Sequence, residues 1–451
     1  MRNSLLMIFL AGLMLTSCGT YKKFQSVTDV PDNLFGTENQ APDTTTIASF
    51  KWQEFFADPF LRSLIDTALI QNTDYQVAKL RTEQAMASLR AAKLAYFPSL
   101  NVGADGNMSR YDGLTTKTYN VGLTASWEID IFGRLTAAKR GMAAAAVSMQ
   151  EQAQAVKTQL IASVANSYYS LLMLDRQIEI ARATLENWEE TIRVMELLKS
   201  AGRANEAGIL QTRANKTGLE ADIVAMEKSR KEIENALCSL LALTPHAITR
   251  GNISDVTLPD NLSTGLPVQL LANRPDIRAA EMELARTHYA VGEARASFYP
   301  ALTLGGTLGF TNNGGVVVNP GQWLLNAVGQ IVQPIFNRGQ LKANYKIAEA
   351  DREIALLQFN QAVIDAGNEV NDALSAISTA RERMSLVKQQ IGLLDEAVTK
   401  TELLMRHSPT NYLEVLTAQQ ALLAAQQAEV EAVYNEIAGI ISLYHALGGG
   451  V

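Results

Sequence analysis

Side chains that could perform catalysis are scattered along this sequence and are not gathered into a motif. The sequence contains no phosphate-binding glycine loop, no His-Glu-x-x-His and no Gly-x-Ser-x-Gly. Ser385-Leu386-Val387-Lys388 and Lys216-Thr217-Gly218 match two pieces of the β-lactamase signature, but they occur in the wrong order and without the third piece. We attribute these matches to chance and expect that the protein is not an enzyme.

Patterns that bind metals or nucleic acids are missing as well. The four histidines do not show the spacing of a metal site; they are His246, His288, His407 and His445. Methionines are common but not clustered, so a path for copper or silver is not indicated, although metal export stays open. The net charge of −7 argues against a nucleic-acid partner, which would need a basic face. We therefore expect no cofactor, no bound metal and no nucleic acid.

The N-terminus contains a cysteine whose surroundings predict covalent modification. An apolar run from Leu5 to Leu15 follows a basic residue, which is typical of a secretory signal peptide, and we place that peptide at residues 1–17. Leu15-Thr16-Ser17-Cys18 resembles the bacterial lipobox, in which the cysteine is acylated and becomes the mature N-terminus. By the same resemblance, Gly19 favours delivery to the outer membrane. An ordinary cleavage site is the alternative interpretation.

The remaining cysteine and the hydropathy pattern limit how the mature chain could be held together or cross a membrane. Cys238 lies in a leucine-rich stretch and is predicted to be a small buried residue. Two cysteines are too few for a disulfide framework. After Cys18 no run of about 18 residues stays apolar, as a transmembrane helix would require. Only closed β-structure could then carry the mature chain across a membrane.

The strongest feature of the sequence is an internal repeat. Tyr96-Phe97-Pro98 returns as Phe298-Tyr299-Pro300, and Ile131-Phe132-Gly133-Arg134 returns as Ile335-Phe336-Asn337-Arg338. Further landmarks follow in the same order and with nearly the same spacing. The chain is therefore interpreted as a tandem duplication over roughly 64–243 and 266–447.

Each copy is expected to contain a very long helix. Residues 136–199 and 340–405 are free of proline and rich in strong helix formers, so each helix would be about 90–100 Å long at a rise of about 1.5 Å per residue. Apolar residues recur every seventh position, for example Leu416, Leu423, Val430 and Ile437. This spacing predicts helices packed along their length. On this pattern alone an ordinary coiled-coil rod is equally acceptable.

Two strand pairs are predicted between the helices, at about 100–109 with 119–129 and 302–311 with 323–333. Apolar and polar residues alternate from Tyr119 to Ile129 and from Leu302 to Thr311, which predicts strands with one apolar and one polar face. Glycine-rich loops are expected at 110–118 and 312–320. Such strands suit a membrane barrel around an aqueous lumen. A soluble half-buried sheet is the alternative, but it would need a covering layer.

Four strands cannot close a barrel by themselves. An open edge in lipid would leave backbone groups unpaired at several kcal/mol each. Several chains must therefore contribute strands to one barrel.

The sequence is similar to the TolC-like outer-membrane efflux family, and specifically to its NodT-type lipoprotein branch. The motifs that carry the resemblance are Asn273-Arg274-Pro275-Asp276-Ile277 with Ala280-Glu281, Phe97-Pro98-Ser99-Leu100, Trp127-Glu128-Ile129-Asp130-Ile131-Phe132-Gly133 and Pro334-Ile335-Phe336. They extend over nearly the whole mature chain. The resemblance implies a mainly α protein with a membrane β part, built from a duplicated helix–strand–strand–helix unit. It also implies a homotrimer whose twelve-stranded β-barrel continues as a long α-helical barrel.

The resemblance further implies a function and its partners. The expected protein is the outer-membrane exit duct of a tripartite efflux system, through which small molecules such as drugs pass passively to the exterior. Its partners would be outer-membrane lipid, a periplasmic adaptor (membrane fusion) protein and an inner-membrane pump. It would be lipid-anchored in the outer membrane and extend into the periplasm. The duct of type I protein secretion, or a structural coiled-coil lipoprotein that forms no channel, would also be compatible with parts of this pattern.

The expected layout follows from the duplication and the resemblance. After the signal peptide, residues 18–60 form a lipid-anchored segment that wraps the equator. The first repeat covers 61–244, a linker or equatorial segment covers 245–269, the second repeat covers 270–447, and 448–451 form a tail.

The helical hairpin tips are the candidate gate and adaptor-docking site, because they lie farthest from the strands. The candidate residues are Gly202, Arg203, Asn205 and Glu206 in the first tip, and Arg406, His407, Asn411 and Glu414 at the second. In the family an acidic ring sits just past the second tip, and Glu414 matches its first position. Its second position is the neutral Thr417. A carboxylate ring would favour the passage of cations.

Overall fold

The computed structural model describes residues 23–26, 34, 46–259, 262, 264, 269–313, 317–407 and 412–450. The expected signal peptide, Cys18 and Asn411 lie outside the described residues. Arg406 and His407 belong to a described helix, but their side chains are outside the description. The chain forms two compact units, and each is considered by itself. The first includes Lys79–Gln152 and Asp276–Ala362, and the second includes Ala153–Pro275 and Val363–Val451.

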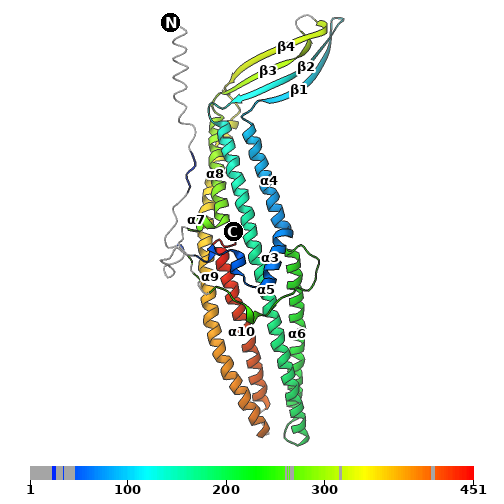
Figure 1. Cartoon of the computed structure of the whole chain (residues 1–451), viewed down its shortest axis with the longest axis vertical. Coiled ribbons are helices and arrows are strands. Elements are labelled where there is room, and N and C mark those ends of the chain that lie inside the picture. The colour runs from blue at the N-terminus through cyan, green and yellow to red at the C-terminus, as the bar shows by residue number, and fades with distance from the viewer. Residues whose placement is uncertain are drawn as a thin grey trace. The chain divides into compact units, whose positions relative to one another are not determined.

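The order of helices and strands repeats along the chain (Figure 1). The first series is α4 (Thr73–Leu94), β1 (Ser99–Tyr111), β2 (Leu114–Ile129), α5 (Arg134–Ser200) and α6 (Glu206–Leu240). The second series is α8 (Pro275–Ala296), β3 (Ala301–Asn313), β4 (Val317–Val332), α9 (Gln340–His407) and α10 (Tyr412–Ala446). Corresponding elements have nearly the same length, for example 67 residues in α5 and 68 in α9. The expected helix–strand–strand–helix unit is thus confirmed.

Short elements stand outside the two series. They are η2 (Ile47–Ser49), α2 (Trp52–Phe55), α3 (Pro59–Gln71), η3 (Ile253–Asp255) and α7 (Gln269–Asn273). Within the described residues, no helix combines the length and the apolar character that a membrane span requires.

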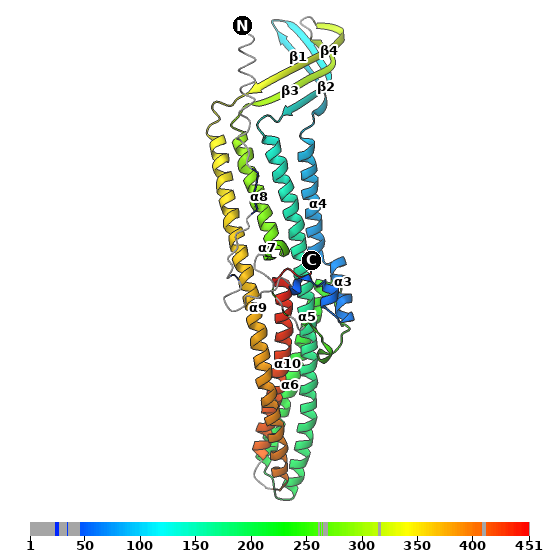
Figure 2. The same cartoon turned by 60° about the vertical axis from the view of Figure 1, so that its left-hand side comes forward.

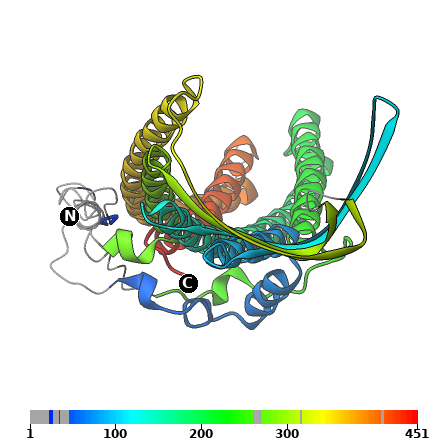
Figure 3. The ribbon, with the colours of Figure 1, turned by 90° about the horizontal axis from the view of Figure 1, so that it is seen from above.

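The four strands form one antiparallel sheet in the order β1-β2-β3-β4 and follow a single curved surface (Figure 3). Directly paired residues lie on the same face of a sheet. One row across all four strands is apolar and consists of Val102, Leu123, Leu308 and Leu325. The adjacent row is polar and consists of Asn101, Thr124, Thr307 and Asn326. The register therefore gives the central part of the sheet one apolar and one polar face, whereas Arg110 and Lys117 lie on the apolar side near the β1–β2 turn.

The strands are longer than the sequence pattern predicted. β1 and β2 continue through the loop expected at 110–118 and are joined only by Asp112 and Gly113, whose φ angles are 45° and 79°. Positive φ at both central residues is the geometry of a tight hairpin turn, which favours the strand twist. β4 begins at Val317, inside the loop expected at 312–320. The predicted loops were too long because polar strand ends resemble loops in composition.

In the first unit the helices follow the same lateral order as the strands, α4–α5–α8–α9 (Figure 2). α5 contacts α4 where Thr82 Oγ1 donates to the Met149 carbonyl at 3.1 Å. It contacts α8 where Ser148 Oγ donates to the Ala279 carbonyl at 3.0 Å. α8 contacts α9 through Arg295 Nη2, 3.1 Å from the Tyr345 hydroxyl. α4 and α9 are therefore the outer helices of this unit.

The core of the second unit is formed by buried aromatic and aliphatic side chains. The rings of Phe55 and Tyr444 stack with centroids 3.9 Å apart. Arg274 of the Asn-Arg-Pro motif is buried and donates to Glu369 at 2.6 Å and to the Ala446 carbonyl at 3.0 Å. Pairing of a buried guanidinium with two acceptors compensates its loss of hydration. Cys238 is buried and free, as its leucine-rich surroundings predicted.

Candidate transport path

The apolar face of the sheet lacks a covering layer of protein. Val102 is 81% exposed and Leu325 is 80% exposed, although both are large aliphatic residues. Further exposed members of this face are Leu100, Met108, Val121, Trp323 and Ile331. An extended apolar surface of this kind needs a nonaqueous partner, and hydrocarbon is a suitable one. The soluble half-buried sheet is therefore not favoured.

The two outer strands carry unused backbone hydrogen-bonding groups. Among the described residues, β1 pairs only with β2 and β4 pairs only with β3. These edges are 13 and 16 residues long. In hydrocarbon each unpaired amide or carbonyl costs several kcal/mol, so both edges need another strand.

The junction between β2 and α5 connects the sheet to the helices of the first unit. Asp130 caps α5 by accepting hydrogen bonds from the amides of Leu135 at 3.0 Å and Thr136 at 2.8 Å. Arg134 forms a two-pronged pair with Glu128, at 2.9 Å and 2.6 Å. The hydrogen bonding that Arg134 donates to Glu128 is the main reason why the pKa of Arg134 is raised. Capping and a two-pronged ion pair fix the direction in which α5 leaves the sheet.

The first tip has the local structure of a capped turn between α5 and α6. Gly202 has φ 73°, a conformation that glycine adopts without strain, and Arg203 N donates to the Leu198 carbonyl at 2.8 Å. Asn205 caps α6 by accepting from Gly208 N at 2.9 Å. Lys199 pairs with Glu206 and holds the pKa of that carboxyl below its usual range. The four predicted residues of this tip are thus brought together in one turn.

The second tip is described only in part. Glu414 lies in the first turn of α10 and is exposed. Arg406 and His407 end α9, while Asn411 lies outside the described residues. The grouping of these four residues into a gate therefore stays a prediction.

A buried cluster joins the two helical hairpins close to the tips. Met195 of α5, Ile209 of α6, Met405 of α9 and Val415 of α10 pack together, each at most 7% exposed. This cluster was not predicted from the sequence, although Val415 directly follows Glu414 in the chain. Its only sequence signal is one apolar residue near the tip end of each of the four helices. We call Met195, Ile209, Met405 and Val415 the tip cluster.

A polar contact between the hairpins lies one to two helical turns from the tip cluster. The amide nitrogen of Gln419 lies 3.1 Å from Glu402 Oε1 and 3.5 Å from the hydroxyl oxygen of Thr191. Gln419 is 7% exposed and lines a cavity of about 320 Å³ together with Trp188. Gln419 Oε1 and Trp188 Nε1 have no hydrogen-bond partner among the described residues. Unpaired buried polar atoms weaken the packing between α5 and α10 at this position.

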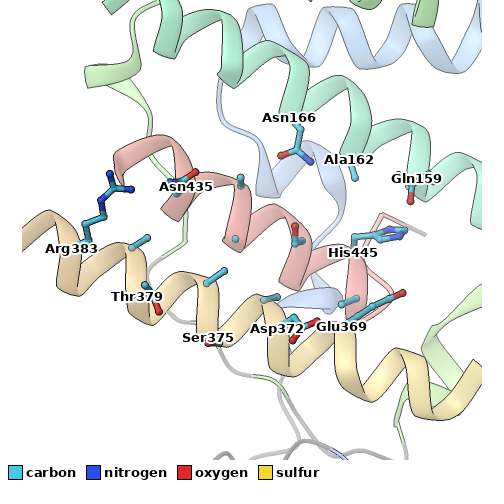
Figure 4. A pocket seen from close by; sticks show the side chains of 17 residues that line it. Gln159, Ala162, Asn166, Glu369, Asp372, Ser375, Thr379, Arg383, Asn435 and His445 are labelled. Atoms are coloured by element: carbon cyan, nitrogen blue, oxygen red, sulfur yellow. The ribbon is translucent and has the colours of Figure 1, made fainter. Parts of the chain in front are cut away.

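A larger groove lies within the second unit between α5, α9 and α10 (Figure 4). It encloses about 860 Å³, and its lining includes Gln159, Asn166, Glu369, Asp372, Arg383 and His445. Among the described residues, no group of three potential metal-ligating side chains converges anywhere. Small apolar residues, among them Ala162, Ala373 and Ala438, complete the lining between these polar side chains.

Comparison with known proteins identifies the family. The family model described as outer membrane efflux protein matches residues 64–243 and again residues 266–449. The chain belongs to the outer membrane efflux protein family. The resemblance inferred from the sequence motifs is confirmed.

Two curated relatives and one solved structure illustrate the family. The cation efflux system protein CusC of Escherichia coli O6:H1 is 30% identical over 99% of this chain and 98% of its own length. The probable outer membrane lipoprotein SilC of Salmonella typhimurium is 30% identical, with 93% of each chain covered. The open-state structure of the Neisseria gonorrhoeae MtrE outer membrane channel matches with TM-score 0.85 and 26% identity, covering 95% and 98% of the two chains.

These matches also establish the fold and the location. The chain is mainly helical with a small strand part, and it has the TolC-like channel fold of a β-barrel with an α-barrel. It is the outer-membrane component of an efflux system and extends into the periplasm.

A matched pair of substitutions on β3 tests the assignment of the two faces. Leu308→Arg puts a charge on the apolar face and should cost about 2–4 kcal/mol near the bilayer midplane, so the level of protein assembled in the outer membrane should fall. Thr307→Arg puts the same charge on the polar face and should leave assembly intact while it shifts ion selectivity toward anions. Membrane fractionation and reversal potentials measure the two effects. Equal loss of assembly in both variants would contradict the assignment.

Truncation of the tip cluster should favour the open arrangement of the hairpins. Met405→Ala removes a buried side chain and about 2–5 kcal/mol of packing, so the higher-conductance states of the channel should be occupied more often. Leu413→Ala, at a residue that is 57% exposed, is the matched control and should behave as the wild type. Single-channel recording measures both variants. Identical open probabilities for Met405→Ala and the wild type would rule out a closing role for the cluster.

Proposed function

We propose that three copies of this chain close a ring in the outer membrane and form a passive exit duct for small molecules such as drugs. The observation that carries this proposal is the single sheet with an apolar face, a polar face and two edges that pair with no other described strand. Strands from several copies would satisfy both edges, turn the apolar face to lipid and turn the polar face to a lumen. The number three comes from the family resemblance.

The polar face supports weak selection among cargoes. Along β3 it consists of Thr303, Gly305, Thr307, Gly309 and Thr311, all of them uncharged. Hydroxyl groups and glycine backbone bind water but offer no deep pocket for one compound. Selection would then belong to an inner-membrane pump, which a periplasmic adaptor connects to this chain, and the duct itself performs no chemistry.

Metal cargo is the second candidate, since CusC is named for cation efflux. The described polar face does not favour a soft-metal path, because Met108, the methionine of the described strands, lies on the same face of β1 as Val102. Thioether and thiolate groups are the ligands that select copper in its reduced state. Small organic cargo is therefore the better-supported proposal.

A structural coiled-coil lipoprotein and a type I secretion duct are less well supported. The coiled-coil lipoprotein would have no use for a sheet with an exposed apolar face. The secretion duct would share the fold, and only the cargo distinguishes it. The relative CusC, which is named a cation efflux system protein, favours an efflux duct over a protein-secretion duct.

The lipid anchor at Cys18 is part of this proposal. The lipobox-like sequence ends at Cys18, and the relative SilC is named a probable outer membrane lipoprotein. Several acyl chains would make attachment durable, at about 0.8 kcal/mol per buried methylene.

Conductance and accumulation together test the duct. The purified protein should give discrete conductance steps in planar bilayers, because a closed barrel leaves an aqueous path. Cells that lack the chain should retain ethidium, and the wild-type chain should restore its export, whereas Leu308→Arg should not. If cells that lack the chain kept normal ethidium levels but no longer released a protein to the medium, the chain would be identified as a secretion duct. Absence of any conductance, in the wild type and in Met405→Ala, would contradict the channel.

The chain's two cysteines provide a matched test of the anchor. Cys18→Ser should abolish incorporation of radiolabelled palmitate, because the thiol that accepts the lipid is lost. Cys238→Ser should leave incorporation unchanged, because Cys238 is buried. Labelled protein from the Cys18→Ser variant would place the acylation elsewhere.

A further inference from the structure

We infer that Phe336 of one copy stacks on Phe97 of the next copy, at a joint that repeats the contact between Phe132 and Tyr299 inside each chain. This inference rests on the proposed ring and names the residues that close it. The partner is a second copy of this chain. The internal duplication of the first unit provides the basis for this pairing.

The duplication places equivalent elements at the centre and at the two ends of the first unit. At its centre, β2 and α5 of the first repeat meet β3 and α8 of the second. At one end lie β4 and α9, which correspond to β2 and α5 in the other repeat. At the other end lie β1 and α4, which correspond to β3 and α8. A second copy can therefore place its β1 beside β4 of the first copy and its α4 beside α9. This contact would repeat the one inside each chain, where β3 lies beside β2 and α8 beside α5. Such a head-to-tail contact forms a ring when the rotation from one copy to the next closes, as the proposed barrel requires.

The central contact contains an aromatic pair, which defines the inner junction at residues 128–134 and 297–301. The rings of Phe132 and Tyr299 are stacked, with centroids 4.9 Å apart and an interplanar angle of 16°. Phe132 follows β2 in the motif Ile-Phe-Gly-Arg, and Tyr299 precedes the proline that leads into β3. Offset stacking of two rings contributes beyond their buried area.

The equivalent residues at the two ends of the first unit are aromatic but uncovered. Phe336 follows β4 in the motif Ile-Phe-Asn-Arg, and Phe97 precedes the proline that leads into β1. Phe336 is 86% exposed and Phe97 is 67% exposed, and Ile335 beside Phe336 is 97% exposed. We call residues 332–338 and 96–100 the two halves of the outer junction. Two exposed rings at equivalent positions fit each other as Phe132 fits Tyr299.

The outer helices continue this uncovered surface. On α4, Leu80, Met86 and Leu94 are exposed, and the last two line a shallow groove. On α9, Ile347 and Ile354 are exposed and lie seven residues apart. Apolar side chains at heptad spacing on outer helices are typical of helix–helix contacts that another subunit completes. The apolar surface of the outer junction therefore extends along both helices.

The inner and outer junctions differ in charge. Val332 stands where the inner junction has Glu128, and Pro334 stands where it has Asp130. The outer junction therefore lacks the equivalents of the Glu128–Arg134 pair and of the Asp130 cap. Contact between copies would rest on apolar packing, which salt does not screen.

Thiol cross-linking of native membranes tests the joint. In a Cys238→Ser background, the double variant Phe97→Cys with Phe336→Cys should be linked by a short bismaleimide into covalent dimers and trimers. The double variant Phe132→Cys with Tyr299→Cys is the matched control and should be linked within one chain, so it should migrate as a monomer. Each single variant should also stay monomeric. Co-expression of the two single variants should yield dimers and no larger species.

The outcomes distinguish the Phe97–Phe336 contact from the assembly of several copies into a ring. A monomer band from the outer pair, in protein whose native size shows several copies, would overturn the Phe97–Phe336 contact and leave the ring standing. Native size of a single copy would overturn both. Phe336→Ala provides a second test without new thiols. It should lower the temperature at which the oligomer dissociates, equally at low and high salt, and an unchanged dissociation temperature would contradict the joint.

Discussion

Unpaired backbone groups at the edges of a sheet constrain the whole molecule. β1 and β4 each offer a full row of amides and carbonyls, and the large side chains between them are exposed and apolar. Water would satisfy the backbone but not the apolar face, and hydrocarbon would satisfy the apolar face but not the backbone. Strands from further copies satisfy both requirements, because a closed ring has no edge.

The rest of the fold follows from this constraint. Since the strands come from two repeats, the inner junction must hold β2 and β3 against α5 and α8, and the Asp130 cap and the Glu128–Arg134 pair do so. A ring in the membrane needs a continuation in water, which the long helices α5 and α9 provide. Near their C-terminal ends, α5 and α9 are joined by the tip cluster, whose packing is apolar.

Local patterns predicted the parts of the structure that depend on local physics. Proline-free stretches and heptads located α5 and α9, and the alternation in β2 and β3 identified the two faces of the sheet. The tight turn at Asp112–Gly113 was missed, although Asp-Gly is a strong hairpin signal, because the polar residues around it resemble a loop. The pairing of Met195 with Met405 had no local signal, since it depends on how two distant hairpins pack.

Hydrogen–deuterium exchange of the assembled protein tests the pairing of the strand edges most directly. Exchange of each backbone amide reports whether that amide is hydrogen-bonded. If the copies close a ring, the amides of β1 and β4 will be as strongly protected as those of β2 and β3. Fast exchange along the outer edges of β1 and β4, beside protected amides in β2 and β3, would show that the sheet stays open and would contradict the account.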